Sequence, residues 1–222
     1  MRADGATVIE VPGTYDDAVR AAAEHGHATG ATVVSDTSWE GYQEIPRWIM
    51  AGYTQLFEEA NSQWDSPPSL VLIQGGVGGL VCAAASWFAW RFGPQRPYMI
   101  ACEPDSAACL MDSARAGKAT RTEGDLSTAM ACLRCAEPSP VAWPAIAAGI
   151  DAFVTVSDQQ VVDTVRRLPV DDPSERVVSG LSGGCGVAAL AALVTSTNLA
   201  EVRQASGLDR STRSLVVISE GA

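Results

Sequence analysis

Short apolar runs alternate along this chain with longer runs that have helical length and spacing. The short runs are typical of buried strands and cover residues 7–11, 31–35, 70–73, 97–102, 152–156 and 214–219. The longer runs predict helices over residues 15–30, 45–63, 80–92, 107–117, 127–134, 138–150, 158–168, 187–195 and 199–206. The alternation predicts an α/β fold with a doubly wound, mostly parallel sheet, in which residues 1–222 form a single region.

Residues that cap helices or favour loops lie between these runs and support their boundaries. Thr14, followed by the acidic Asp16 and Asp17, is a good start for the first helix. A loop is expected at residues 171–173. The first strand, helix and second strand would form a βαβ unit, whose strands pair in parallel through a right-handed crossover.

The stretch over residues 69–85, SLVLIQGGVGGLVCAAA, joins an apolar strand to an apolar helix through Gly75, Gly76, Val77, Gly78 and Gly79. A strand, a glycine turn and a helix present backbone N–H groups to an anion, most often a phosphate. No Lys-Ser/Thr pair follows, so this is not a Walker A loop, and valine at position 81 makes a poor dinucleotide motif. The loop suits a single phosphate; a tight turn that binds nothing is the alternative interpretation.

Polar residues follow several of the expected strands, and ligands in doubly wound sheets bind beyond the carboxyl ends of the strands. These ends are Ser35-Asp36, Gln74-Gly75, Cys102-Glu103, Val156-Ser157 and Ser219-Glu220. Asp36 also has Trp39 and Tyr42 nearby in the sequence, and aromatic neighbours lower the local polarity and favour a usable proton acceptor. An aspartate that caps a helix or a turn is the alternative for Asp36.

The composition and net charge of the chain exclude some classes of binding partner. The 222 residues carry a formal charge of −11 without any Lys/Arg cluster, which argues against nucleic acid and anionic membranes as partners. We expect no signal peptide and no membrane span, because the N-terminus has no apolar core and the run near Leu80 ends at Arg91. Cys82, Cys102 and Cys185 lie in apolar segments, which fits reduced thiols and a cytoplasmic protein.

Two further motifs carry little weight. Cys132 and Cys135 have CxxC spacing, but no second such pair or suitably spaced histidine pair completes a zinc site, so no metal is expected. Incidental cysteines, or a thiol pair with Cys109, are the preferred interpretations. Ser182 lies among glycines without the G-x-S-x-G pattern of a nucleophile elbow, which disfavours a serine hydrolase.

Taken together, several segments resemble the C-terminal part of the diaminopropionate ammonia-lyase family, fold type II pyridoxal-phosphate enzymes related to the tryptophan synthase β subunit. The matching segments lie at residues 15–19, 36–42, 45–53, 74–79, 103–105, 135–138, 179–183 and 218–221. D-T-S-W-E-G-Y and I-P-R-W-I-M are the most specific of them. The resemblance spans nearly the whole chain in the same order.

The resemblance implies a chemistry. The family uses pyridoxal phosphate to convert 2,3-diaminopropionate, a small amino acid, into pyruvate and ammonia by α,β-elimination. By resemblance, Gly75, Gly76, Val77, Gly78 and Gly79 hold the cofactor phosphate, and Ser219 faces the pyridine nitrogen. Asp36 matches an aspartate that removes the α-proton from one substrate enantiomer, for which a carboxylate must lie within hydrogen-bond reach. A homodimer or a complementing N-terminal chain is the expected partner.

The departures from the family qualify this expectation. Family members are roughly twice as long, so the chain is expected to be truncated, and Leu181 replaces an expected acidic residue. The Schiff-base lysine of the family precedes the glycine loop, whereas the single lysine here, Lys118, follows it. Two alternatives to an active lyase remain: a catalytically silent fragment or split subunit that needs a separate N-terminal chain, and a nucleotide- or phosphate-binding α/β module.

Overall fold

The computed structural model describes residues 1–168 and 177–221, which divide into two compact units, Met1–Val34 and Ser35–Ala222. The loop expected at residues 171–173 lies outside the described residues. That residues 1–222 correspond to the C-terminal part of a two-domain lyase stays a prediction.

The first unit contains a short 3₁₀ helix, η1 (Arg2–Asp4), and the helix α1 (Tyr15–Thr29). The predicted cap is confirmed: the N–H of Thr14 donates to Asp17 Oδ2 over 2.7 Å, and the side chain of Thr14 in turn accepts from the N–H of Asp17. Gly30, at φ 74°, ends the helix in the left-handed conformation that glycine adopts without strain.

The two strands predicted at residues 7–11 and 31–35 are wrong, and so is the βαβ unit built from them. Among the described residues neither segment joins a strand ladder. Their side chains Ile9 and Val34 remain 66% and 73% exposed. A β-branched sequence favours extended backbone, but a strand forms only where a neighbouring strand accepts and donates its backbone hydrogen bonds.

The second unit is built on a parallel sheet with the strand order β3-β2-β1-β4. The strands are β1 (Leu70–Gln74), β2 (Tyr98–Pro104), β3 (Ala152–Val156) and β4 (Ser214–Val216). In the register of the central pair, Gln74 lies opposite Cys102 at the carboxyl ends. The four predicted strands of this region are confirmed, with the last one shorter than expected.

Helices flank this sheet and connect its strands. They are α2 (Glu44–Asn61), α3 (Gly79–Phe92), α4 (Cys109–Ala116), α5 (Trp143–Gly149), α6 (Asp158–Arg166), α7 (Cys185–Thr195) and α8 (Ala200–Ala205), with the 3₁₀ turns η2 (Gly93–Gln95), η3 (Ala131–Leu133) and η4 (Thr197–Leu199). The helix predicted at residues 127–134 shrinks to η3. Thr128 Oγ1 accepts from the N–H of Met130 and donates to Asp158, a local alternative to helical bonding.

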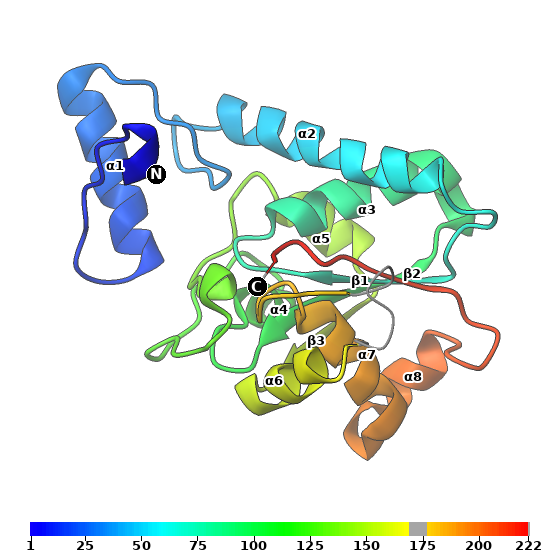
Figure 1. Ribbon diagram of the computed structural model, residues 1–222. Coiled ribbons are helices and arrows are strands. Elements are labelled where there is room, and N and C mark those ends of the chain that lie inside the picture. The colour runs from blue at the N-terminus through cyan, green and yellow to red at the C-terminus, as the bar shows by residue number, and fades with distance from the viewer. Residues whose placement is uncertain (169–176, 222) are drawn as a thin grey trace. The chain divides into compact units, whose positions relative to one another are not determined.

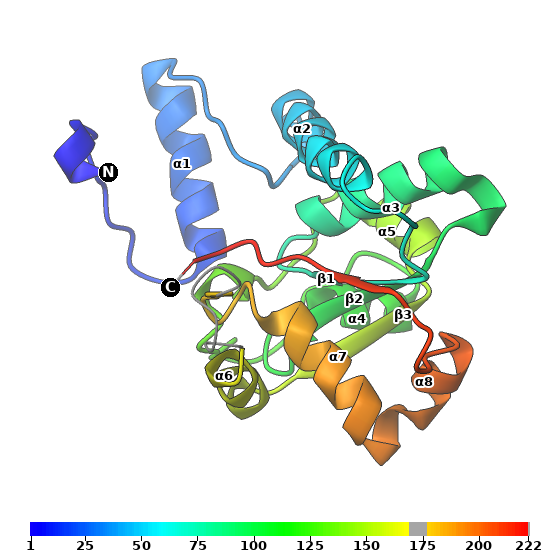
Figure 2. The same ribbon diagram turned by 45° about the vertical axis from the view of Figure 1, so that its right-hand side comes forward.

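Side chains alternate between the two faces of the sheet and divide the core in two. Val71 and Ile73 of β1 pack with α3 and α5, whereas Leu70 and Leu72 pack with α7. Figures 1 and 2 show α3 and α5 on one side of the strands and α7 on the other. Burial on both faces is what a doubly wound parallel sheet requires, so the predicted fold class is confirmed.

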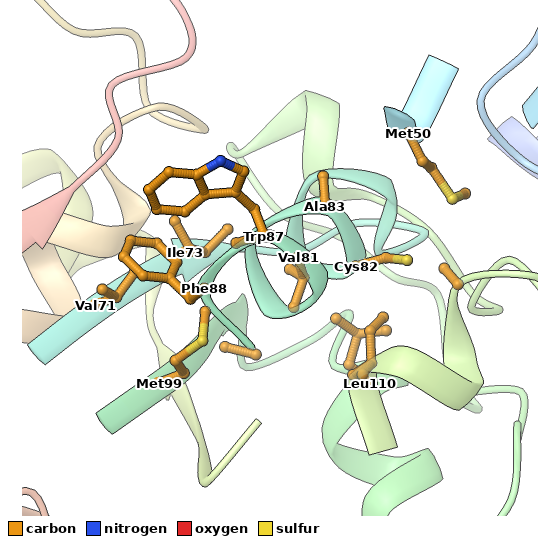
Figure 3. Close-up of a cluster of buried hydrophobic side chains, with 14 of the residues drawn as sticks. Met50, Val71, Ile73, Val81, Cys82, Ala83, Trp87, Phe88, Met99 and Leu110 are labelled. Carbon is orange, nitrogen blue, oxygen red and sulfur yellow. The ribbon is translucent and has the colours of Figure 1, made fainter. Parts of the chain in front are cut away.

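The core above β1 is rich in aromatic residues. Figure 3 shows Trp87 and Phe88 of α3 beside Val71 and Ile73 of β1. Phe57 of α2 lies 5.7 Å from Phe88 between ring centroids, which joins the two helices. Burying each such ring stabilises the fold by roughly 1.5–3 kcal/mol, so α3 is held firmly against the sheet. This rigidity fixes the position of the glycine loop at its start.

The helices of the described residues include none that is by itself long and apolar enough to cross a membrane. The pair Cys185–Thr195 and Thr197–Ala205, bent by 95°, meets the length and composition only when both segments are joined.

Candidate functional site

The glycine loop between β1 and α3 is fixed from three sides. The N–H of Gly75 donates to the carbonyl of Cys102 on β2 over 2.9 Å. The carbonyl of Val77 accepts from the N–H of Ser139 over 2.8 Å, and that of Gly76 accepts from Cys109 Sγ over 3.4 Å. The carbonyls therefore turn into the protein.

Two of the glycines leave no room for a side chain. A Cβ on Gly75 would lie 2.5 Å from Leu110 Cδ1. Gly78 has φ 93°, and a Cβ there would lie 2.5 Å from Ile146 Cδ1. The first position needs glycine for packing and the second for both packing and backbone conformation.

The mouth of the loop, in contrast, is open. Gly79 is the first residue of α3, and a Cβ there would meet nothing closer than Tyr53 Cε2 at 3.5 Å. None of the hydrogen bonds found among residues 1–168 and 177–221 uses the N–H groups of Val77, Gly78 or Gly79. Free N–H groups at the positive end of a helix dipole form an anion site, and a glycine lining leaves room for a phosphate. We call residues 75–79 the glycine cup.

Asp36 lies at this mouth. A Cβ on Gly79 would stand 3.7 Å from Asp36 Oδ2, although the two residues are far apart in sequence. Burial raises the pKa of the Tyr53 phenol, and the nearby charge of Asp36 raises it further. The structure thus brings a carboxylate and a phenol to the rim of the glycine cup.

The aromatic neighbours expected around Asp36 have another role. Trp39 and Tyr42 stack on each other with ring centroids 4.1 Å apart, and Tyr42 Oη accepts from the N–H of Ser35 over 3.0 Å. They shape the loop that follows Asp36. Tyr53, which the sequence analysis overlooked, is the aromatic residue at the rim; its only signal was its place in the I-P-R-W-I-M-A-G-Y segment.

A serine pair ties the Asp36 loop to the glycine cup. The N–H of Ser38 donates to Ser139 Oγ over 3.0 Å, and the N–H of Val141 donates to Ser38 Oγ over the same distance. Ser139 also donates its own N–H to Val77. Both serines are buried, so the rim and the cup form one hydrogen-bonded unit. Sequence reasoning did not find this pair.

Ser219 lies just beyond β4, next to the start of the cup. Gln74 Nε2 donates to Ser219 Oγ over 2.7 Å and to the carbonyl of Val217 over 2.9 Å. The Ser219 residue is exposed, whereas Gln74 is buried. The structure therefore places a serine hydroxyl on a firm support at the same edge of the sheet as the cup.

The end of β2 is occupied by a buried carboxyl group. Glu103 accepts the N–H of Leu110 and that of Met111, over 2.7 and 2.8 Å, at the start of α4. Burial raises the pKa of Glu103 to about 8, against the opposing effect of these two hydrogen bonds. The chain itself thus fills the N-terminus of α4.

The CxxC segment lies between the glycine cup and the glycine-rich segment around Ser182. The N–H of Cys132 donates to Ser182 Oγ over 3.1 Å, and Cys135 Sγ would lie 3.0 Å from a Cβ on Gly76. Cys132 is exposed and Cys135 buried, and none of the six cysteines, all within the described residues, forms a disulfide. These residues act as walls around the cup.

Lys118 lies away from this edge. It follows α4, whose first residue Cys109 contacts the cup, and its N–H donates to the carbonyl of Ser113 over 3.1 Å. An eight-residue helix spans roughly 12 Å, so the exposed Lys118 stands at the far end of α4 from the cup.

A cavity of about 420 Å³ lies elsewhere, between α2 and α3. Its lining comes from the later turns of the two helices: Thr54, Gln55, Glu58, Ser86, Trp87 and Trp90. The converging polar groups at the strand ends, rather than this apolar cavity, define the candidate site.

A glycine cup, a supported serine just beyond the adjoining strand and a carboxylate at the rim together make up a candidate site for a phosphate-bearing ligand. The comparisons specify the cofactor class. The family model "Pyridoxal-phosphate dependent enzyme" matches residues 1–219, and the chain belongs to that family.

Comparison with curated relatives shows which members of this family the chain is similar to. The chain is 35% identical over 223 residues to the diaminopropionate ammonia-lyase of Escherichia coli strain K12, a match over 98% of this chain and 56% of the relative. It is 33% identical over 229 residues to the Salmonella typhimurium enzyme, with 100% and 57% covered. The chain therefore spans a little over half the length of these relatives.

Comparison with solved structures agrees with the comparison of sequences. The Escherichia coli diaminopropionate ammonia-lyase in complex with an aminoacrylate-PLP azomethine reaction intermediate superposes with a TM-score of 0.87 at 34% identity, covering 98% of this chain and 56% of that one. Maize serine racemase superposes with a TM-score of 0.78 at 20% identity, covering 99% and 60%. The second likeness shows the shared fold alone.

Proposed function

We propose that this chain carries the cofactor-binding and proton-accepting part of a pyridoxal-phosphate-dependent ammonia-lyase, which acts by α,β-elimination on 2,3-diaminopropionate or a closely similar small amino acid. The observation that supports this most is the place of Asp36. Its carboxylate lies at the rim of the glycine cup, where a Cβ on Gly79 would stand 3.7 Å from Oδ2.

The residues present fit the cofactor. Val77, Gly78 and Gly79 offer N–H groups to its phosphate, and Gly79 adds no side chain at the mouth where the phosphate would sit. Ser219 offers its hydroxyl to the pyridine nitrogen. When bound, pyridoxal phosphate supplies an electron-withdrawing ring that makes the Cα–H bond of an amino acid acidic. Asp36 then accepts the α-proton at a carboxylate oxygen.

The lysine that anchors the cofactor must come from elsewhere. Lys118 is exposed at the far end of α4 and does not reach the cup. We propose that a separate N-terminal chain supplies an amine near the cup, because a second copy in a homodimer would bring only another Lys118. Alone, residues 1–222 bind the cofactor without a lysine linkage. We also expect a cytoplasmic location, supported by buried thiols such as Cys102 and Cys185.

The first experiment measures cofactor binding by the purified chain. Equilibrium dialysis with pyridoxal phosphate, NAD and ATP is expected to show binding of pyridoxal phosphate in preference to the two nucleotides. Borohydride reduction followed by mass spectrometry is expected to leave Lys118 unmodified. Preference for a nucleotide would favour the alternative of a nucleotide-binding module, and a reduced adduct on Lys118 would overturn the assignment of the lysine.

The second experiment tests the chemistry by complementation. The chain is co-expressed with the N-terminal segment of the Escherichia coli enzyme that it does not match, and pyruvate formation from 2,3-diaminopropionate is measured. Asp36→Asn is expected to lower the rate by about 10²–10⁴-fold, the usual contribution of a positioned base, and to keep cofactor binding. Asp65→Asn, an exposed aspartate outside the site, is the matched control. Failure of complementation would favour a catalytically silent chain.

A further inference from the structure

We propose that the cavity between α2 and α3 binds a small organic ammonium ion, at a site separate from the glycine cup. Its volume of about 420 Å³ lies within the range of roughly 300–1,000 Å³ that is typical of small-molecule sites. None of the described residues that line it belongs to the cup, and neither Asp36 nor Ser219 is among them. The inference therefore does not depend on the proposed function.

An open indole forms one wall of the cavity. Trp90, in the last turn of α3, is 77% exposed. Trp64 and Trp87 belong to a cluster of packed rings, whereas Trp90 takes part in none of the ring contacts found among the described residues. The face of an indole attracts a cation more strongly than that of tyrosine or phenylalanine. Trp90 thus offers a face that the protein itself leaves uncovered.

A carboxylate from α2 lines the same cavity and is held by a buried partner. Glu58 Oε2 accepts the Nε1–H of Trp87 over 3.1 Å, and Trp87 is buried. Figure 3 shows this nitrogen on the edge of Trp87 that faces away from Val71 and Met99. Within the described part of the chain no donor reaches Glu58 Oε1, and no basic group forms an ion pair with this carboxylate. One oxygen is therefore fixed while the other stays available to a cationic ligand.

The ends of both helices favour a positive charge at this place. Figure 1 shows α2 and α3 side by side and running in the same direction, and Phe57 packs on Phe88 between them. Glu58 and Trp90 both lie in the last turn of their helix, where the helix dipole is negative. A carboxylate there is unfavourable by itself, and the last turn of α2 has no basic residue to offset it. A bound cation relieves this repulsion.

Arg91 follows Trp90 in the sequence, but it does not fill the cavity. Its guanidinium carbon lies 5.7 Å from the centroid of the Phe92 ring, and the residue is not part of the lining. The described lining contains no lysine, arginine or histidine. The cavity therefore has a carboxylate without a counter-charge from the chain, and this charge complementarity assigns a cation to it rather than an anion.

The lining also decides what kind of cation fits. No group of three or more His, Cys, Asp or Glu side chains within the described residues could hold a metal ion, and a single carboxylate leaves such an ion mostly hydrated. The indoles of Trp87 and Trp90 instead suit a cation with alkyl groups, which packs against a ring and is attracted by it. Thr54 and Ser86 add hydroxyl groups for a polar substituent. The ligand class is thus a small alkylammonium compound.

The test titrates the full chain with choline at millimolar concentrations, and with 3,3-dimethylbutan-1-ol as the uncharged isostere of choline. The six tryptophans give separate indole N–H signals in NMR. Choline is expected to shift the signals of Trp87 and Trp90 but not that of Trp48, which is 63% exposed on α2 outside the cavity. The uncharged alcohol is expected to bind at least about fivefold more weakly, because it lacks the cation–π attraction.

Two variants test the two walls. Glu58→Gln keeps an acceptor for Trp87 but removes the charge, and Trp90→Ala removes the open indole. Each is expected to weaken choline binding by about three- to fivefold. Glu59→Gln removes the same charge from the next residue, which does not line the cavity, and is expected to leave binding unchanged. Circular dichroism checks that all three variants fold.

Three outcomes would overturn the ammonium site. Equal binding of choline and the uncharged alcohol would indicate an apolar groove without charge selection. Equal losses in Glu58→Gln and Glu59→Gln would show that the acidic chain attracts choline without a defined site. Unmoved indole signals of Trp87 and Trp90 would place any binding elsewhere. Dialysis with pyridoxal phosphate tests the proposed function separately, since neither wall of the cavity belongs to the glycine cup.

Discussion

Two glycine-rich loops of this chain precede two apolar core helices, and only one of them is open. The first, the glycine cup, leads into α3 with unused N–H groups at its mouth. The second, at residues 179–184, leads into α7, and the chain itself closes it: the N–H of Gly180 donates to the carbonyl of Glu220 over 3.1 Å. A Cβ on Gly183 would lie 3.0 Å from the backbone nitrogen of Glu220.

The difference lies in what each loop faces rather than in its composition. The glycines of the second loop let the C-terminal segment approach closely, whereas Gly79 of the first loop leaves its mouth open. Glycine content alone therefore does not identify a binding site. A loop binds when its backbone donors face a space that the protein leaves unfilled.

The largest expected effect comes from Gly78→Ala in the cup. The residue has φ 93°, and its new Cβ would press on Ile146. Left-handed strain costs about 1–3 kcal/mol, and overpacking adds about 1–3 kcal/mol. We expect cofactor binding to fall by more than about 100-fold, measured by fluorescence titration, and the free energy of unfolding to fall in urea titrations.

Gly183→Ala is the matched control in the second loop. It crowds the backbone of Glu220 and is expected to cost about 1–2 kcal/mol of stability, while cofactor binding changes by less than about twofold. Equal losses of binding in the two variants would contradict the distinction between an open and a filled loop.

The next effect is a pH dependence of stability, which comes from the buried Glu103 side chain at the N-terminus of α4. The unfolded Glu103 carboxyl ionises near its ordinary pKa of 4.5, whereas burial keeps the folded one protonated to about 8. Between these values the folded state holds the extra proton, so stability falls as pH rises, by about 1.4 kcal/mol per unit and on the order of 5 kcal/mol in total.

Glu103→Gln isolates this contribution. The variant is expected to lose the downward slope between about pH 5 and about pH 8, because its amide does not titrate. Chemical denaturation at several pH values measures the difference between the two proteins. A parallel pair of pH profiles would show that Glu103 is not the source of the slope.

A smaller effect is expected in the second loop. Glu220 Oε2 is buried without a hydrogen-bond partner among the described residues. Glu220→Gln replaces a buried charge by a neutral amide and is expected to raise the free energy of unfolding by about 1 kcal/mol. Thermal melting at low ionic strength measures this. Destabilisation would indicate that the carboxylate holds a cation, and the second loop would then also be a binding loop.

The smallest effect is expected for Cys132, which lies between the glycine cup and the second glycine-rich loop. Cys132 is exposed, and its backbone rather than its side chain contacts Ser182. Cys132→Ser is expected to change stability by less than about 0.5 kcal/mol. In the wild type a thiol reagent should modify Cys132 first, because burial raises the pKa of Cys185 to about 12 and leaves it unreactive. Mass spectrometry of the labelled peptides checks the order.

Local signals predicted much of the second unit. β1, the glycine cup and α3 follow one another within about two dozen residues, and their apolar runs and glycines determine them with little help from distant residues. The cap at Thr14 also follows from its own neighbourhood. The ends of the expected strands already singled out Asp36 and Ser219, and the resemblance to a known family implied a catalytic role for Asp36 and a cofactor-binding role for Ser219; both roles stay predictions.

The rest depends on contacts between distant residues. The segments at residues 7–11 and 31–35 have strand composition, but only the position of other strands decides whether they find a ladder. Gln74 and Ser219 are separated by 145 residues, so their hydrogen bond is invisible in the sequence pattern. Likewise, Tyr53 reaches the rim because α2 packs on α3, and the local sequence does not predict this packing.

The lone lysine beyond α4 has a practical consequence. Amine-directed chemistry, whether acylation, biotinylation or attachment of a fluorophore, can mark this chain only at Lys118 and at the N-terminal amine. Since Lys118 is exposed and separated from the glycine cup by the length of α4, a dye placed there leaves the cup untouched. Lys118 is therefore a suitable attachment site for immobilising the chain or for following the binding of a complementing segment in real time.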